Sequence, residues 1–173
     1  MASDQRPEPE TAGPELQQLC AFLDFLRATV LWKAEGLDAE QLRRPHPPST
    51  LTLGGILNHL ALVEDHWFEV RFAGLPTREP WASVDWKADP DFEFRTAADL
   101  DPEEIRKRYL DACARSREVV GLAESLDQLS VKAWPDGRHW DLRWVLIHMI
   151  EETARHAGHA DLIRESIDGQ TGE

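Results

Sequence analysis

The chain has 173 residues, 42% apolar and 29% charged, which is enough for one sizeable hydrophobic core and excludes a fibrous, disordered or disulfide-rich protein. Thirty-two acidic side chains against nineteen basic ones give a net charge of -13, which argues against a nucleic-acid binder and a polybasic membrane binder. Cys20 and Cys113 lie far apart within helical apolar patterns, so we interpret them as core thiols in a reducing compartment rather than a cysteine-only metal site.

The first 14 residues predict a flexible arm rather than a signal peptide or a helix, because they hold three prolines and three acids but no apolar run. We therefore expect the protein in the cytoplasm. The longest stretch without Asp, Glu, Lys or Arg, residues 45–63, contains three prolines and two histidines and cannot span a membrane.

Prolines leave four long windows for helices, because an interior proline removes a helix hydrogen bond. The windows are residues 15–44, 49–75, 103–134 and 136–173. Apolar residues recur at helical spacing in the first window at Leu16, Leu19, Cys20, Leu23, Leu26 and Val30. This pattern predicts a first helix that stops near Gly36.

Capping residues predict where the other three helices begin. The expected helices cover about 53–73, from 102 to the mid-120s, and from 142 to about 167. Their predicted N-caps are Thr52, Asp101 and Asp141, and Glu104 completes a capping box with Asp101. No segment shows the period-2 alternation of a half-buried strand over more than a few residues, so we expect an all-α four-helix bundle.

The connection over residues 75–100 is unusually long for a compact domain. It holds three prolines and four large aromatic residues, Trp81, Trp86, Phe92 and Phe94. A structureless connection of this length is usually a lid, a binding loop or a partner surface. We therefore expect a flexible arm at 1–14, a bundle over 15–169 with a long aromatic-rich loop between its second and third helices, and a tail at 170–173.

Ionisable residues occupy the apolar face of the fourth predicted helix. Glu152 and His156 share this face, and His148 and His159 border it. A buried, unpaired carboxylate costs several kcal/mol, so Glu152 needs a cationic or metal partner. Spacing alone leaves three pairs open as ligands: Glu152/His156, His148/Glu152 and His156/His159.

The second predicted helix supplies a third ligand, because His59 shares a face with Val63 and Val70. His66 lies on that face too, but roughly 10 Å farther along the helix, which is too far to bind the same ion. Two histidines and one carboxylate with open positions are typical of catalytic divalent-metal sites. The alternatives are a hydrogen-bonded core histidine and a buried ion pair.

Two segments resemble the DinB/YfiT-like superfamily, in particular its uncharacterised actinobacterial subgroup. They are 52–74, TLGGILNHLALVEDHWFEVRFAG, and 141–168, DLRWVLIHMIEETARHAGHADLIRESID, and the resemblance extends over about 15–169. It implies a four-helix bundle that holds one metal through one side chain of the second helix and two side chains of the fourth. In this sequence those side chains are His59, Glu152 and His156.

The family's commonest pattern on the fourth helix, His-x-x-x-His-Arg-Gly-Gln, differs from this sequence at three positions. Glu152 replaces the first histidine, which resembles the mycothiol-dependent maleylpyruvate isomerase branch and its His, Glu, His ligand set. Ala157 replaces the arginine and His159 the glutamine, although a histidine can still hold a ligand by hydrogen bonding.

The resemblance also implies a function, because several relatives use mycothiol or bacillithiol as a cosubstrate. The first hypothesis is a divalent-metal-dependent thiol S-transferase or isomerase, with zinc or nickel as the preferred ion and a small-molecule thiol and an electrophile as substrates. His148 or His159 would orient a ligand or relay a proton, and the loop 75–100 would cover the acceptor.

Two other hypotheses compete with this one. The second is a non-catalytic metal-binding or stress-related bundle protein. The third is a metal-free bundle whose aromatic loop docks a partner or mediates homodimerisation. Metal content separates the third hypothesis from the others, and turnover of a thiol with an electrophile separates the first from the second.

Overall fold

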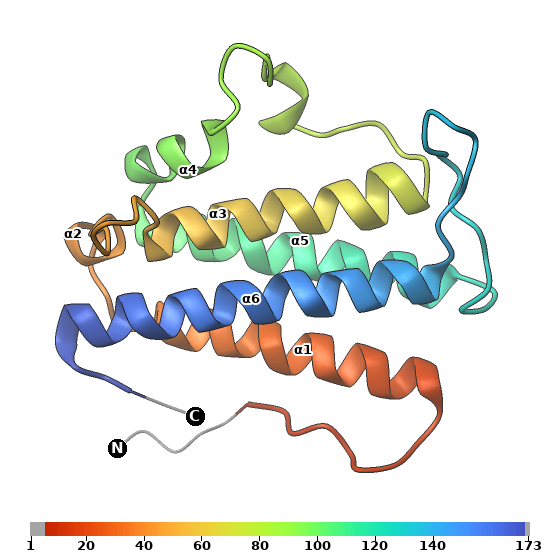
Figure 1. Ribbon diagram of the computed structural model, residues 1–173, viewed down its shortest axis with the longest axis horizontal. Helices are drawn as coiled ribbons and strands as arrows, with labels where there is room; N and C mark the ends of the chain where they lie inside the picture. Colours follow the sequence, from red (N-terminus) through yellow and green to blue (C-terminus); the bar gives the residue numbers. More distant parts are fainter. Residues whose placement is uncertain (1–5, 172–173) are drawn as a thin grey trace.

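The computed structural model describes residues 6–171, and every regular element within that range is a helix (Figure 1). The expected all-α class is therefore confirmed. The long elements are α1 (Glu15–Lys33), α3 (Leu53–Glu64) with its π-helical continuation η1 (Asp65–Phe72), α5 (Pro102–Leu122) and α6 (Leu142–Asp168). The short elements are α2 (Ala39–Leu42), η2 (Trp81–Ser83), α4 (Phe92–Thr96) and η3 (Ala97–Asp99). The predicted arm and tail extend into residues 1–5 and 172–173, which lie outside the described range.

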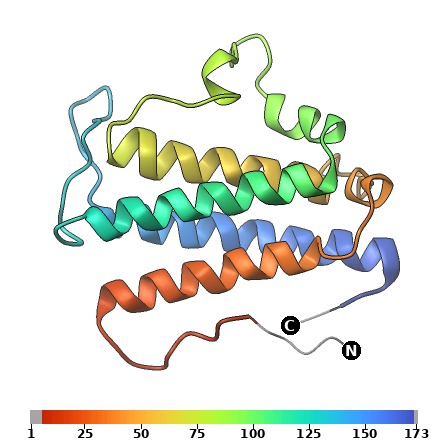
Figure 2. The same cartoon turned by 180° about the vertical axis from the view of Figure 1, so that it is seen from behind.

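The long helices lie side by side. The main packing partner of α1 is α6, and that of α3 is α5, while α3 also contacts α6 (Figures 1 and 2). The segment that contains η2 and α4 lies over α3, on the side away from α1, in both views. No helix within residues 6–171 is long and apolar enough to cross a membrane.

The predicted helix starts are present. Thr52 Oγ1 accepts a hydrogen bond from the Gly55 backbone N–H at 3.0 Å, and Asp141 Oδ1 accepts one from Trp144 at 2.7 Å. The Asp101 N–H donates to Glu104 Oε2 at 3.1 Å. These contacts satisfy backbone donors that the first turn of a helix leaves without an intrahelical partner, so each helix begins where its capping residue stands.

Two stretches differ from the sequence prediction. The predicted helix over 53–73 is α-helical only to Glu64 and continues as a π-helix, so the 100° wheel does not hold for its second half. Residues 75–100 were expected to be structureless, but they contain η2, α4 and η3. Trp81 explains part of this order, because it is buried and its Nε1–H donates to Asp65 Oδ2 at 3.1 Å.

Buried apolar side chains form two clusters along the long helices. One contains Ile56, Leu60 and Ile163, and the other contains Phe68 and Met149. Cys113 is buried in the first cluster and Cys20 packs against the second, and both thiols are free. Burial raises the pKa of Cys113, which keeps its thiol protonated and unreactive.

Candidate metal centre

Three potential metal ligands meet between α3 and α6. His59 Nε2 lies 3.2 Å from Glu152 Oε1, and His156 Nε2 lies 3.5 Å from the same oxygen. One ligand atom from each of the three residues lies within 4.8 Å of the other two. A single cation could therefore contact all three.

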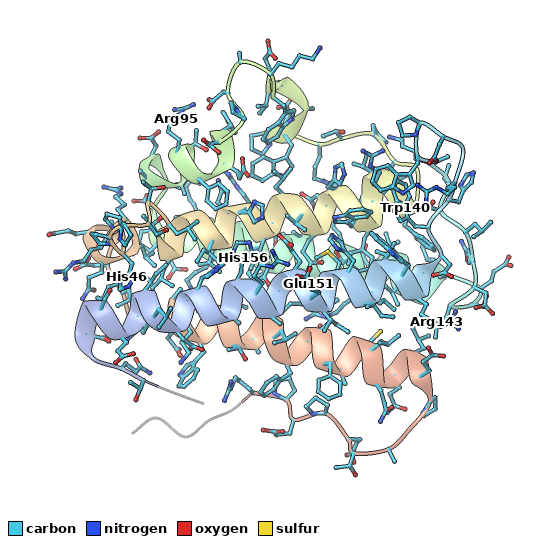
Figure 3. The ribbon with its side chains drawn as sticks, viewed as in Figure 1. His46, Arg95, Trp140, Arg143, Glu151 and His156 are labelled. Atoms are coloured by element: carbon cyan, nitrogen blue, oxygen red, sulfur yellow. The ribbon has the colours of Figure 1, made fainter. Side chains whose placement is uncertain are left out.

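Regular helix geometry brings two of these side chains together. Glu152 and His156 are one turn apart on α6, whose flanking residues Val145, Met149 and Ala160 are fully buried. Figure 3 shows His156 near the middle of α6, whereas Arg143 lies near its N-terminal end. Because α3 packs against this part of α6, its His59 reaches the pair from the opposite side.

The charges around the cluster favour a positively charged occupant. Hydrogen bonds from His156 and His59 hold the pKa of Glu152 far below its usual range. Burial alone would lower the pKa of His59, but its hydrogen bonds to Glu152 and Glu93 outweigh burial and raise it. The carboxylates that attract a proton to His59 would attract a metal cation to the same place.

Sequence analysis missed Glu93, which holds the other side of the His59 ring. Glu93 Oε1 lies 3.0 Å from His59 Nδ1, and the Glu93 side chain is only 7% exposed. The neighbouring Phe94 ring stacks on the His59 ring at 4.7 Å between centroids, with an interplanar angle of 17°. Residues 92–96 thus contact the centre from α4, within the stretch that was predicted to be structureless.

A short chain of hydrogen bonds fixes Glu93 in turn. Asn58, next to His59 on α3, donates from Nδ2 to the backbone oxygen of Glu93 at 2.7 Å. Arg108 on α5 donates to Asn58 Oδ1 at 2.8 Å. One signal for this role is visible in the sequence, an acid between two phenylalanines, Phe92-Glu93-Phe94, but nothing there indicates which histidine the acid contacts.

The other histidines of the prediction occupy different places. The His159 ring lies 5.3 Å from that of His156, and burial together with the nearby His156 lowers its pKa. His148 stacks on Trp144 at 5.0 Å and lies 4.6 Å from the Trp67 ring, and no hydrogen bond within residues 6–171 joins it to the cluster. His66 lies farther along η1 and takes no part in the cluster, as expected.

The donor set fits a divalent ion. Two imidazole nitrogens and one carboxylate oxygen suit zinc or nickel and leave coordination positions for another ligand. If His59 donates its Nδ1–H to Glu93, its Nε2 lone pair points toward Glu152 and His156, which is the usual arrangement around a metal-bound histidine.

The fold and this cluster define an all-helical protein with a histidine and carboxylate centre between two of its long helices. The family model described as mycothiol-S-transferase matches residues 18–169 of the chain. The chain therefore belongs to the mycothiol-S-transferase family, a DinB-like family, as its sequence resemblance indicated.

The remaining comparisons concern the fold. A crystal structure described as a conserved protein of locus from Enterococcus faecalis aligns with a TM-score of 0.65 at 16% identity, covering 92% of this chain and 100% of that one. At this identity the similarity shows the fold alone. No curated protein matches the sequence.

Proposed function

We propose that this protein is a metal-dependent thiol S-transferase of the cytoplasm, in which His59, Glu152 and His156 hold one divalent ion. The substrates are a small thiol of the mycothiol type and an electrophile. The observation that carries this proposal is the convergence of three ligand atoms within 4.8 Å, at the positions that the family resemblance predicts. We infer that the four long helices form a DinB-like four-helix bundle whose role is to hold these ligands.

The chemistry of the reaction needs a thiolate at neutral pH. A divalent ion at this site would stabilise the thiolate form of a bound thiol, which is the form that attacks electrophiles. The product forms when the sulfur bonds to the acceptor carbon, the leaving group departs with the electron pair of the broken bond, and the thiol proton passes to a base. We assign the role of base to His159, whose ring lies 5.3 Å from that of His156.

Side chains around the cluster prepare His59 for its role. Glu93 accepts the hydrogen bond of His59 Nδ1 and so fixes the ring's tautomer and orientation. Phe94 covers one face of the ring, which limits the access of water from that side. Asn58 and Arg108 keep Glu93 in place, so we infer that α4 is a functional part of the centre.

Metal content tests the ligand assignment. Untagged protein is dialysed against zinc or nickel and its metal content is measured, alongside a His59→Ala, His156→Ala double variant. The proposal expects about one equivalent in the wild type and almost none in the variant. His46→Ala is the matched control, because this loop histidine lies near the N-terminal end of α3, away from His156, and should leave binding unchanged (Figure 3). Less than about a tenth of an equivalent in the wild type would overturn the assignment.

Turnover tests the activity separately. Metal-loaded protein is incubated with mycothiol, bacillithiol or glutathione and a bimane reagent, and its rates are compared with those of Glu152→Ala. A rate above that of the variant for at least one thiol supports a transferase. Equal rates for every thiol, with metal still bound by the wild type, would favour a non-catalytic metal-binding protein.

A further inference from the structure

A cavity of about 540 Å³ lies beside the second half of the α3 and η1 stretch. Its volume is within the range of small-molecule sites. Three segments form its walls, which are one face of α3 and η1, the first part of the connection 75–100, and Lys132 from the loop before α6. None of the three proposed metal ligands lines this cavity, so the cavity is distinct from the candidate metal centre.

Aromatic rings form much of the cavity wall. Trp67 comes from η1, and Trp81 and Trp86 come from the connection that follows it. Trp81 is buried and anchored to Asp65, whereas Trp86 is 36% exposed. Rigid rings of this kind provide a flat apolar surface on which a planar ligand can stack.

Positive charge gathers at one part of the cavity. Arg71 and Lys132 line it, both half-buried, and neither forms an ion pair with a carboxylate within residues 6–171. Arg71 Nε donates to His66 Nε2 at 3.0 Å, which leaves its other guanidinium N–H groups for a ligand. Burial, Arg71 and Lys132 lower the pKa of His66 to about 4. In a chain with a net charge of -13, this positive corner suits an anion.

The π-helix explains why these groups meet. In an α-helix, residues five positions apart point in directions about 140° apart, so His66 and Arg71 would diverge. In η1, which has the i to i+5 pattern of a π-helix, they lie on the same side and form a hydrogen bond. Short π-helical segments are rare in proteins, but those that do occur often lie at functional sites.

The cavity begins close to the candidate metal centre. Leu62 and Val63, which line it, lie about one turn beyond His59 on α3. His66 lies roughly 10 Å from His59 along the helix axis. On α6, His148 lies against Trp67 and is one turn before Glu152. A ligand that fills the cavity would therefore lie along α3 and η1, from Leu62 and Val63, one turn beyond His59, to Arg71.

We propose that this cavity binds the electrophilic acceptor, and that it selects acceptors with a flat apolar body and a carboxylate group placed near Arg71 and Lys132. This inference rests on the proposed transferase function and names its substrate class. Because the thiol sulfur would bind at the metal centre, we assign the separate cavity, which the metal ligands do not line, to the acceptor. In the test reaction below, the C–S bond forms as the C–Cl bond breaks, chloride leaves with the bonding electrons, and the thiol proton goes to a base.

Paired acceptors test the preference. The rates with 4-chloro-3,5-dinitrobenzoate and with its neutral amide are measured at saturating mycothiol for the wild type, Lys132→Gln and Arg71→Gln. The ratio of kcat/KM for the two acceptors cancels changes that affect both. We expect the ratio to fall about tenfold or more in either variant, mainly through the KM of the carboxylate. Arg44→Gln, an exposed arginine outside the cavity, is the control and should leave the ratio unchanged.

Lys132→Gln is the more informative variant, since Arg71 also lies over the Trp140 ring at 5.5 Å and its loss could disturb packing. A wild-type ratio that both variants retain would overturn the inference while leaving a transferase in place.

A binding measurement separates this inference from the proposed function. Calorimetric titration of the wild type with 3,5-dinitrobenzoate and 3,5-dinitrobenzamide needs no thiol and no turnover. Tighter binding of the carboxylate, lost in Lys132→Gln, would support the cavity assignment even if no thiol transfer were detected. Equal binding of both compounds, or binding that Lys132→Gln does not weaken, would overturn it.

Discussion

His59 and His66 lie seven residues apart on one helical stretch, yet their surroundings have opposite charge. His59 has carboxylates on both sides, Glu93 at 3.0 Å and Glu152 at 3.2 Å. His66 accepts a hydrogen bond from Arg71, and Lys132 lies in the same cavity. The pKa of His59 is raised in spite of burial, whereas that of His66 falls to about 4.

The contrast shows that most of the groups that set the charge around each histidine come from outside the helical stretch that carries it. Glu93 comes from α4, Glu152 from α6 and Lys132 from the loop before α6, whereas Arg71 lies on η1 itself. One end of the stretch thereby suits a cation and the other suits an anion. The transferase proposed above would use the first region to bind the metal ion and the second to bind the acceptor.

A buried ion pair is formed by Glu64, which lies between the two histidines in the sequence. Glu64, at the end of α3, is fully buried and accepts two hydrogen bonds from Arg27 on α1, at 2.7 and 2.5 Å. Its partner is a guanidinium that stays charged at every pH of interest, whereas the partners of Glu152 are imidazoles that can also bind a metal. We assign it a structural role.

The largest effect is expected from breaking this pair. Arg27→Ala leaves the Glu64 carboxylate buried with only the weak Cys113 thiol donor among the described residues and without its cationic partner, which should lower the free energy of unfolding by about 3 to 5 kcal/mol. Urea denaturation with and without metal measures the loss, which should be similar in both conditions. A double variant, Arg27→Met with Glu64→Leu, should recover most of it. A loss below about 1 kcal/mol in Arg27→Ala would show that the pair does not hold α1 and α3 together.

Metal removal should have the next largest effect on stability, and this effect should depend on the ligands His59 and His156. Ligand binding adds about 2.7 kcal/mol of stability at a free concentration one hundred times Kd. Chelation should therefore lower Tm by roughly 5 to 10 °C, while helical circular dichroism persists at room temperature. The His59→Ala, His156→Ala variant should show no shift. Complete unfolding of the wild type on chelation would instead indicate a structural metal site.

The third prediction concerns Glu93, which would affect metal binding by orienting His59 rather than by contacting the ion. Glu93→Gln should weaken metal binding about 10- to 100-fold, since the outer hydrogen bond that orients a ligating histidine commonly has this effect. Competition with a chromophoric chelator measures the affinity. Glu79→Gln is the control, because this exposed acid lies in the same connection and, within residues 6–171, its side chain accepts a hydrogen bond from Ser83 alone. Equal affinities for both variants would exclude a positioning role for Glu93.

The regular parts of this molecule were the parts that its sequence could predict. α6 is an uninterrupted helix of 27 residues, so the wheel correctly placed Glu152 and His156 on the side that faces α3. The caps Thr52 and Asp141 act within three residues along the chain, and such local contacts can be predicted from spacing.

The parts that escaped prediction depend on irregular backbone or on distant contacts. The change from α- to π-helix after Glu64 leaves no periodic signal, so the pairing of His66 with Arg71 was not foreseen. Glu93 lies on a five-residue helix, 34 positions from His59, and only the tertiary packing of α4 on α3 brings the two together.

The smallest expected effect is the contribution of His66 to the pH dependence of the free energy of unfolding. Because the folded-state pKa of His66, about 4, lies below its ordinary value of 6.5, the unfolded chain binds the proton more tightly. The stability due to neutral His66 is thus complete above pH 6.5 and is lost progressively as the pH falls toward 4. Between pH 7 and pH 5, chelator-treated wild type should lose about 1 to 2 kcal/mol more than His66→Gln, which keeps an acceptor for Arg71. Urea denaturation at both pH values measures the difference. An equal loss in both proteins would mean that burial, Arg71 and Lys132 do not lower the pKa of His66.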